Sequence, residues 1–362
     1  MSHTPTLYIA GLGMITPVGA NSAMTAASVN AGISGYAQSN YYAKNGELIT
    51  MAAVPNQVFT DIDATLDEGR RYAHCHDRIL KMAIIALRQA CAQHTTQHSV
   101  PLVLAMPEPE GQIDIGGLVS LIHTLEQNCA PWVTSLQTRT IHSGRAAGME
   151  AIEFAFRYLY DLPDDFILIG ASDSHQDNTR LEPLINADRL LAPGNIDGFA
   201  PGEAACFLLL TRHPALAMER NGQIIALTPP GIAKEPGHLG SEAPYRGDGL
   251  DQAIKHALIN HQQPNIHTIY SSMNGEHHWA KEYGVALMRN KKSFIDKVKT
   301  EHPADIFGDL GAATAPTLIA LAAEALFKNK NAHAHLVYSS SDSATRGAIV
   351  VEKVTIAAEN II

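Results

Sequence analysis

Cysteine is scarce in this chain, and its spacing suits neither disulfide nor metal chemistry. Four cysteines occur among the 362 residues, at Cys75, Cys91, Cys129 and Cys206, and no pair has the CxxC spacing. The pattern is typical of a reducing compartment and argues against a disulfide scaffold or a structural zinc site. The 18 histidines form no HExxH motif and no His/Cys cluster at ligand spacing, so we expect neither a metal nor any other cofactor.

Charged side chains are also few, and cations are in the minority. Charged residues make up 17% of the chain, below the roughly 25% of typical soluble domains. Part of the surface must therefore be apolar or covered, which favours an oligomer. The 36 acidic residues outnumber the 26 basic ones, for a formal net charge of -10. This charge argues against a nucleic-acid binder and against a basic membrane-surface protein.

Long apolar runs are absent as well. No run approaches the ~20 residues of a membrane-spanning helix. The first residues, MSHTPTLYIAGLG, lack the basic region and cleavage site of a signal peptide. From the sequence we therefore expect no membrane span and a cytoplasmic location.

What the chain does contain is an alternation of strand-like and helical segments. The apolar runs at 166–170 (FILIG) and 202–210 (GEAACFLLL) predict strands buried on both faces. Two helices rich in alanine or glycine are predicted at 144–160 and 314–327, each behind a turn. Small side chains suit helices packed between two sheets, so the pattern predicts a layered α/β protein with similar halves, 1–215 and 216–362. Residues 36–70 are predicted to be an irregular polar excursion, and 132–136 a short strand.

The opening segment, TLYIAGLGMITPVG at residues 6–19, is not a dinucleotide-binding loop. It has no third glycine at the required spacing, and Pro17 stands where a helix should open. Instead it resembles the start of the β-ketoacyl synthases of the thiolase superfamily, which reads roughly VVITGLGxxTPxG. The resemblance continues in order along the chain, at RAAG (145–148), GASD (170–173), DGFAPGEAA (197–205) and GDLGAA (308–313). It implies a thiolase-type five-layer α/β/α/β/α fold with two pseudo-repeated halves.

The same resemblance places unsuitable residues at the family's catalytic positions. Its chemistry needs a cysteine nucleophile at a helix N-terminus and two histidines that stabilise the enolate and the oxyanion. In the matched register these positions hold Arg145, Asn274 and Asp309. The family's phenylalanine-gated closing loop matches residues 339–345 (SSSDSAT), with Ser341 and Ser343 in place of the two phenylalanines. The resemblance therefore implies that the condensation chemistry is lost.

Three interpretations of Arg145 remain open. A cation at a helix N-terminus opposes the helix dipole, so Arg145 either pairs with Asp309 and plugs the former active site, or awaits an anionic ligand, or is solvated in a leftover cleft. The candidate cleft that the resemblance implies consists of His142, Arg145, Asn274, His277, Asp309, Ser341 and Ser343.

Three functions are compatible with these features. The first is a catalytically degenerate ketosynthase that resembles chain-length-factor subunits, forms a homodimer or a heterodimer with a ketosynthase through residues 132–140, and contacts an acyl carrier protein. The second is a non-enzymatic adaptor in a bacterial secretion or assembly system. The third is an acyltransferase with a different active site. Serines at 341 and 343 weaken the first, since an acyl tunnel needs apolar walls, and so does the acidic net charge, because carrier proteins are acidic too.

Overall fold

The first half of the chain contributes five adjacent strands to the sheet. The computed structural model describes residues 5–63, 66, 74–94, 99–109, 114–259 and 266–356. The strand order is β1-β7-β6-β4-β5, with β7 antiparallel to both its neighbours and β4 parallel to both of its own. The strands are β1 (Leu7–Ile15), β4 (Leu102–Met106), β5 (Thr138–His142), β6 (Phe166–Ser174) and β7 (Glu203–Thr211).

The second half repeats this order and these strand directions. Its order is β8-β13-β12-β10-β11, with β13 antiparallel to its neighbours and β10 parallel to its own. The pairs Leu7–Leu227 and Tyr8–Ala226 join β1 to β8 and make one 11-stranded sheet. The remaining strands are β8 (Gln223–Leu227), β9 (Gly231–Lys234), which pairs with β13, β10 (Ile266–Tyr270), β11 (Phe294–Glu301), β12 (Ala334–Ser340) and β13 (Thr345–Thr355).

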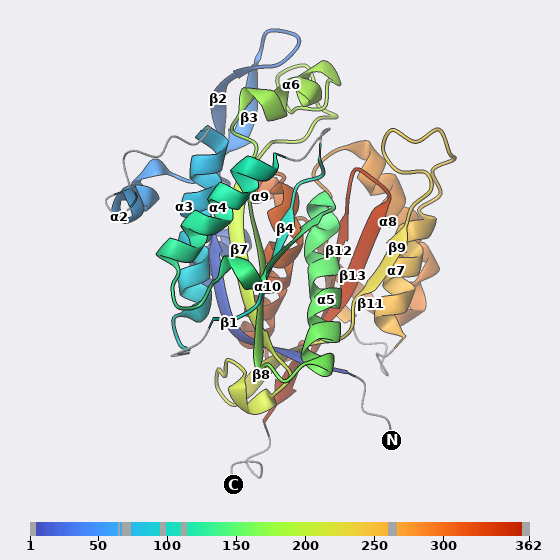
Figure 1. Cartoon of the computed structure of the whole chain (residues 1–362). Coiled ribbons are helices and arrows are strands. Elements are labelled where there is room, and N and C mark those ends of the chain that lie inside the picture. The colour runs from blue at the N-terminus through green and yellow to red at the C-terminus, as the bar shows by residue number, and fades with distance from the viewer. Residues whose placement is uncertain are drawn as a thin grey trace.

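Helices cover both outer faces and fill the space between the halves (Figure 1). Helices α3 (His74–Cys91) and α4 (Ile115–Asn128) lie on one outer face of the molecule, and α7 (Asp248–Leu258) and α8 (His277–Arg289) lie on the other outer face. Helices α5 (Ala147–Asp161) and α10 (Thr314–Lys328) contact strands of both halves and each other. The mixed α/β layering implied by the resemblance is confirmed.

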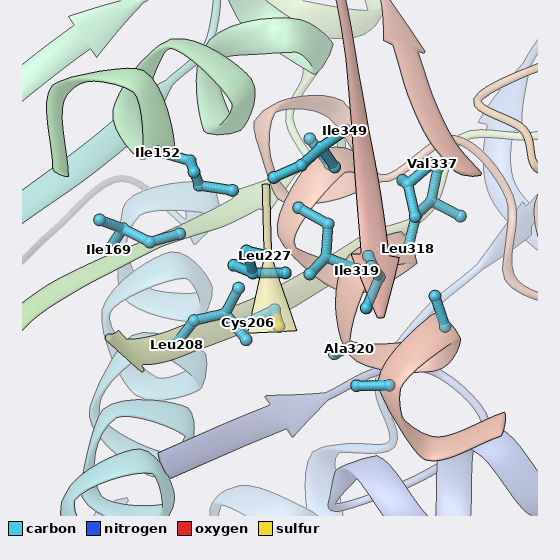
Figure 2. Packing of buried hydrophobic residues seen from close by; sticks show 14 of the residues in the cluster. Ile152, Ile169, Cys206, Leu208, Leu227, Leu318, Ile319, Ala320, Val337 and Ile349 are labelled. Atoms are coloured by element: carbon cyan, nitrogen blue, oxygen red, sulfur yellow. The ribbon is translucent and has the colours of Figure 1, made fainter. Parts of the chain in front are cut away.

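Small residues let the two central helices approach closely. A Cβ at Gly148 of α5 would lie 2.6 Å from Pro316 Cδ of α10, a distance that only glycine allows. Figure 2 shows the core around them, where Ile152 of α5 and Ile319 of α10 meet side chains from strands of both halves. The alanines at 147, 151, 155, 315, 320 and 322 are fully buried there. The alanine-rich composition therefore follows from burial between two sheet layers.

The prediction for residues 36–70 was wrong where the structure describes them. Strands β2 (Tyr36–Tyr42) and β3 (Leu48–Ala52) form an antiparallel hairpin, followed by a 3-10 helix (Asn56–Phe59) and α2 (Thr60–Asp63). The polar side chains face solvent, while Ile49 and Met51 pack with Leu181 of α6 (Asn178–Asn186). The missed signal was the alternation of more buried and more exposed side chains along each strand, which the many polar residues of the segment conceal. Residues 64, 65 and 67–70 lie outside the described residues.

The strand predicted at 132–136 was also wrong. A short 3-10 helix (Ser135–Gln137), with its N-terminus capped by the Thr134 hydroxyl, occupies part of that segment, and β5 begins at Thr138. Strand β11 (Phe294–Glu301) was missed, because its sequence FIDKVKTE is too polar for an apolar-run criterion. No helix in the described part of the chain is long and apolar enough to cross a membrane.

Candidate functional site

The candidate site forms where β5 turns sharply into α5. Gly144 has a φ of 63°, a left-handed conformation that costs other residues energy. Gly144 opens a short 3-10 helix (Gly144–Ala146) that leads into α5. The turn places Arg145 on the first turn before the central helix, where its side chain is 7% exposed. We call the turn at residues 143–146 the first elbow.

A second turn faces it from the other half. Gly308 has a φ of 77°, and Asp309 follows it, two residues before the 3-10 helix (Gly311–Ala313) that opens α10. The Asp309 N–H donates to the Ala200 carbonyl, and the Gly202 N–H donates to the Asp309 carbonyl, each at 2.8 Å. The motif at 197–205 therefore holds this turn in place. We call the turn at residues 308–311 the second elbow.

The two elbows meet through an ion pair. Arg145 Nη1 lies 2.6 Å from Asp309 Oδ2, and the side chains are 7% and 2% exposed. This confirms the predicted pairing of Arg145 with Asp309. Arg145 Nε also donates to the Ser340 carbonyl at 2.9 Å, and its guanidinium lies 4.5 Å from the ring centroid of Trp279. The arginine is thus held on several sides and is not solvated in an open cleft.

Asp342 links this pair to a second arginine. Its Oδ1 accepts from Arg145 Nη2, and its Oδ2 accepts from Arg189 Nη1 at 2.6 Å. Arg189 in turn forms a two-pronged pair with Glu276, with Nε–Oε1 at 2.7 Å and Nη2–Oε2 at 2.9 Å. One carboxylate therefore bridges two guanidinium groups.

Asn274 closes these contacts into a ring. Its amide nitrogen lies 2.8 Å from Asp309 Oδ2 and 3.1 Å from Glu276 Oε2. The Trp279 indole N–H also donates to Glu276 Oε2, at 2.9 Å. Each side chain of the resulting cycle contacts the next, and we call the cycle the elbow ring: Arg145, Asp342, Arg189, Glu276, Asn274 and Asp309.

Pairing keeps these groups charged in spite of their burial. Burial opposes ionisation of Asp309, but Arg145 and further partners hold its pKa below the ordinary value. Burial likewise opposes the charge on Asp342, and the neighbouring Arg145 and Arg189 outweigh it, so its pKa is lowered strongly. For Arg145 the desolvation is outweighed by Asp309, Asp342 and Glu276, and its pKa is raised. Arg145, Asp309 and Asp342 are therefore ionised at neutral pH.

Hydrogen bonds with the serine-rich loop at 339–345 hold the first elbow in place. Ser339 Oγ donates to the Arg145 carbonyl at 2.7 Å, and the Ala146 N–H donates to Ser341 Oγ at 2.9 Å. Ser341 is fully buried, whereas Ser343 is exposed at the rim and bonds Glu108 through its N–H at 3.0 Å. Of the two predicted loop residues, only Ser341 lies within the site.

The two candidate histidines do not join the ring. His142 ends β5, is half-buried, and faces a separate cavity of about 340 Å³ with Ile79 and Met106. Burial lowers its pKa. The assignment of His277 to the cleft was wrong. His277 begins α8 with its side chain 78% exposed and pairs with Asp197 in solvent, Nδ1–Oδ1 2.5 Å.

Sequence reasoning missed half of the ring. Asp342 lies between the two serines that it singled out, and Glu276 lies two residues after Asn274. An acidic residue in the loop matched to the family's gate was a usable signal for Asp342. No sequence signal pointed to Arg189, because it reaches the ring only through the path of the loop after α6.

No described cysteine stands in for a nucleophile at the first elbow. Cys91, Cys129 and Cys206 are all buried, and burial raises the pKa of Cys91 and of Cys129 to about 12. A thiol with a raised pKa is a poor nucleophile. Within the described ranges, no group of three or more His, Cys, Asp or Glu side chains is arranged to hold a metal ion.

Comparison with solved structures shows which fold this is. The chain resembles the ishigamide ketosynthase/chain length factor, at 15% identity and a TM-score of 0.71, over 97% of this chain and 99% of that one. It resembles a ketosynthase in complex with its chain length factor from Xenorhabdus doucetiae, at 16% identity and a TM-score of 0.70, over 97% of this chain and 99% of that one. It also resembles a ketosynthase from module 6 of the bacillaene synthase of Bacillus subtilis, at 12% identity and a TM-score of 0.73, over 96% of this chain and 72% of that one.

The fold is therefore the thiolase-type fold of ketosynthases and chain length factors, matched over nearly the full chain. No family model and no curated protein matches the sequence.

Proposed function

We propose that this chain is a catalytically degenerate ketosynthase-like protein that works as a non-condensing partner subunit, in the manner of a chain length factor. The observation that carries the proposal is Arg145. A charged guanidinium, paired at 2.6 Å with Asp309, occupies the position that the sequence resemblance matches to the nucleophile, where condensation requires a thiolate at a helix N-terminus. An arginine cannot carry an acyl group.

The rest of the site supports the same proposal. The sequence resemblance matches Asn274 and Asp309 to the two histidines, and both side chains are engaged in the elbow ring. A carboxylate held ionised repels a developing oxyanion, and the amide nitrogen of Asn274 already donates to Asp309 and Glu276. Restoring condensation would therefore require at least two simultaneous changes, at 145 and 309.

A partner surface is available at the edge of the sheet. Strand β5 (Thr138–His142) ends the strand order and has no neighbour on its outer side among the described strands. Leu136 beside it is 94% exposed, and Val119 of α4 is 60% exposed. An open strand edge flanked by apolar side chains is a template for pairing with another chain. Two matched structures contain a ketosynthase with a chain length factor or with an acyl carrier protein.

Co-expression with a cysteine-containing ketosynthase encoded beside this chain tests the proposal. We expect a stable one-to-one complex in which condensation depends on the cysteine of the partner and is absent from this chain alone. Leu136→Glu should weaken the complex, whereas Ile259→Glu, a matched control 76% exposed in the other half, should not.

Two results would reject the proposal. Condensation by this chain without a partner would refute degeneracy. The folded protein could also fail to bind any such ketosynthase and instead capture secretion or assembly components. That result would favour the adaptor function, which the sequence features already allowed.

A further inference from the structure

Asp342 differs from the other carboxylates of the elbow ring in its exposure. Its side chain is 32% exposed, against 2% for Asp309 and 8% for Glu276. It lies at the surface end of the 339–345 loop, next to the exposed Ser343. Among the three carboxylates of the ring, the Asp342 side chain is therefore the one on the solvent side.

The charges of the ring show that this carboxylate is in excess. Arg145 and Arg189 contribute two positive charges, and Asp309 and Glu276 contribute two negative ones. Asp342 adds a fifth charge and leaves the ring at a formal -1. Its two oxygens nevertheless accept from Arg145 Nη2 and from Arg189 Nη1, which have no other hydrogen-bond acceptor among the described residues. Two guanidinium donors are thus aimed at one carboxylate-sized space.

A cavity of about 90 Å³ adjoins that space. Its lining includes Arg145, Asp342, Phe199 and His175. His175 is 8% exposed, and neither of its ring nitrogens has a hydrogen-bond partner within the described part of the chain. Burial, followed by the nearby Arg180, lowers the pKa of His175, so the ring is neutral and can both donate and accept. A buried polar group without a hydrogen bond is costly, and this ring, with Nε2 4.0 Å from Asp309 Oδ1, lies beside the carboxylate position.

We infer that Arg145 and Arg189 form a binding site for a small monocarboxylate, and that the Asp342 side chain occupies this site in cis as an autoinhibitory contact. A monoanion in place of the Asp342 carboxylate restores the present charge of the ring. A phosphate dianion would add a further negative charge beside Asp309 and Glu276, which disfavours it. The small cavity beyond limits the ligand to a short chain that reaches toward His175. The inference goes beyond the proposed function and needs no partner subunit.

Removing the internal carboxylate tests the site. We compare the full-length wild type with Asp342→Ala, which vacates the position, and Asp342→Asn, which fills it with a neutral group. The probes are sodium acetate, sodium phosphate and sodium chloride at matched ionic strength, and the readouts are the thermal unfolding midpoint and isothermal titration calorimetry. The double variant Asp342→Ala/Arg189→Gln removes one arm of the site.

We expect acetate, relative to chloride, to raise the midpoint of Asp342→Ala saturably and to bind it with one-to-one stoichiometry. The wild type and Asp342→Asn should not respond, because a tethered group at high effective concentration outcompetes free acetate. The double variant should lose the response. If Asp342→Ala does not fold in chloride, refolding in acetate replaces the midpoint as readout.

Several results would overturn the inference. They are an equal acetate response in the wild type, no acetate effect on the folding or stability of Asp342→Ala, or a response that persists in the double variant. A stronger response to phosphate than to acetate would overturn the assignment to monocarboxylates.

Discussion

The two elbows share a glycine of positive φ and a charged residue, and the two charges are opposite. Gly144, with φ 63°, and Arg145 lie within the 3-10 helix that leads into α5, whereas Gly308, with φ 77°, and Asp309 precede the 3-10 helix that leads into α10. Asp309 lies near the N-terminus of α10, where the helix dipole favours an anion, whereas Arg145 lies near the N-terminus of α5, where the dipole opposes a cation. The helix dipole of its own half thus favours Asp309, whereas Arg145 depends on carboxylates from the other half.

The largest expected effect comes from breaking the pair at its arginine. Arg145→Ala leaves Asp309 buried without its cation, which should lower the free energy of unfolding by about 3–5 kcal/mol. Urea unfolding followed by circular dichroism measures the loss.

The matched change at the second elbow should cost less. Asp309→Asn keeps the side-chain shape and leaves Arg145 paired with Asp342, so we expect a loss of about 2 kcal/mol. The double variant should lose less than the sum of the two. A strictly additive double variant would show that the two elbows do not interact.

The glycines offer a second way to compare the elbows. A Cβ at Gly308 would lie 2.5 Å from the Ala200 carbonyl oxygen, which is fixed backbone, whereas at Gly144 the nearest atom is Glu108 Cγ at 2.9 Å, in a side chain that can move. We expect Gly308→Ala to destabilise by about 3 kcal/mol and Gly144→Ala by about 1–2 kcal/mol. Thermal unfolding of both variants checks the order, and equal losses would contradict it.

A buried histidine of the second half should make the protein sensitive to acid. Strand β12 buries His335, whereas its counterpart β6 is apolar in its buried first half. Burial lowers the pKa of His335 to about 4. A histidine with a lowered folded-state pKa is protonated first in the unfolded chain, so stability falls as the pH drops from about 6.5 to about 4.

We expect this loss to reach about 3 kcal/mol and to be reduced in His335→Gln. Unfolding measured at a series of pH values tests it. Identical pH profiles for the wild type and the variant would rule His335 out as the cause.

The smallest expected effect concerns the histidine that lies outside the site. His277 pairs with Asp197 in solvent, with side chains 78% and 57% exposed. His277→Ala should change the free energy of unfolding by less than about 0.5 kcal/mol. A loss comparable to that of Arg145→Ala would mean that His277 belongs to the elbow network after all.

The sequence predicted those parts of the molecule that depend on local pattern. Apolar runs identified β6 and β7, and the turn motifs at 145–148 and 308–313 correctly placed Arg145 and Asp309 in the same cleft. What escaped prediction depends on long-range placement. Arg189 reaches the site through the course of a loop, and the hairpin β2–β3 is stabilised by packing on α6. His277 was misplaced because neighbours along a chain, such as Asn274, can face opposite ways at a helix start.

The central claim is that this elbow carries no acyl group, and the intact mass of the protein tests it most directly. The purified chain is incubated with acyl thioesters and analysed by mass spectrometry, beside a cysteine-containing ketosynthase as the positive control. We predict an unchanged mass for this chain under conditions that acylate the control. A stoichiometric acyl adduct on any of its residues would contradict the account.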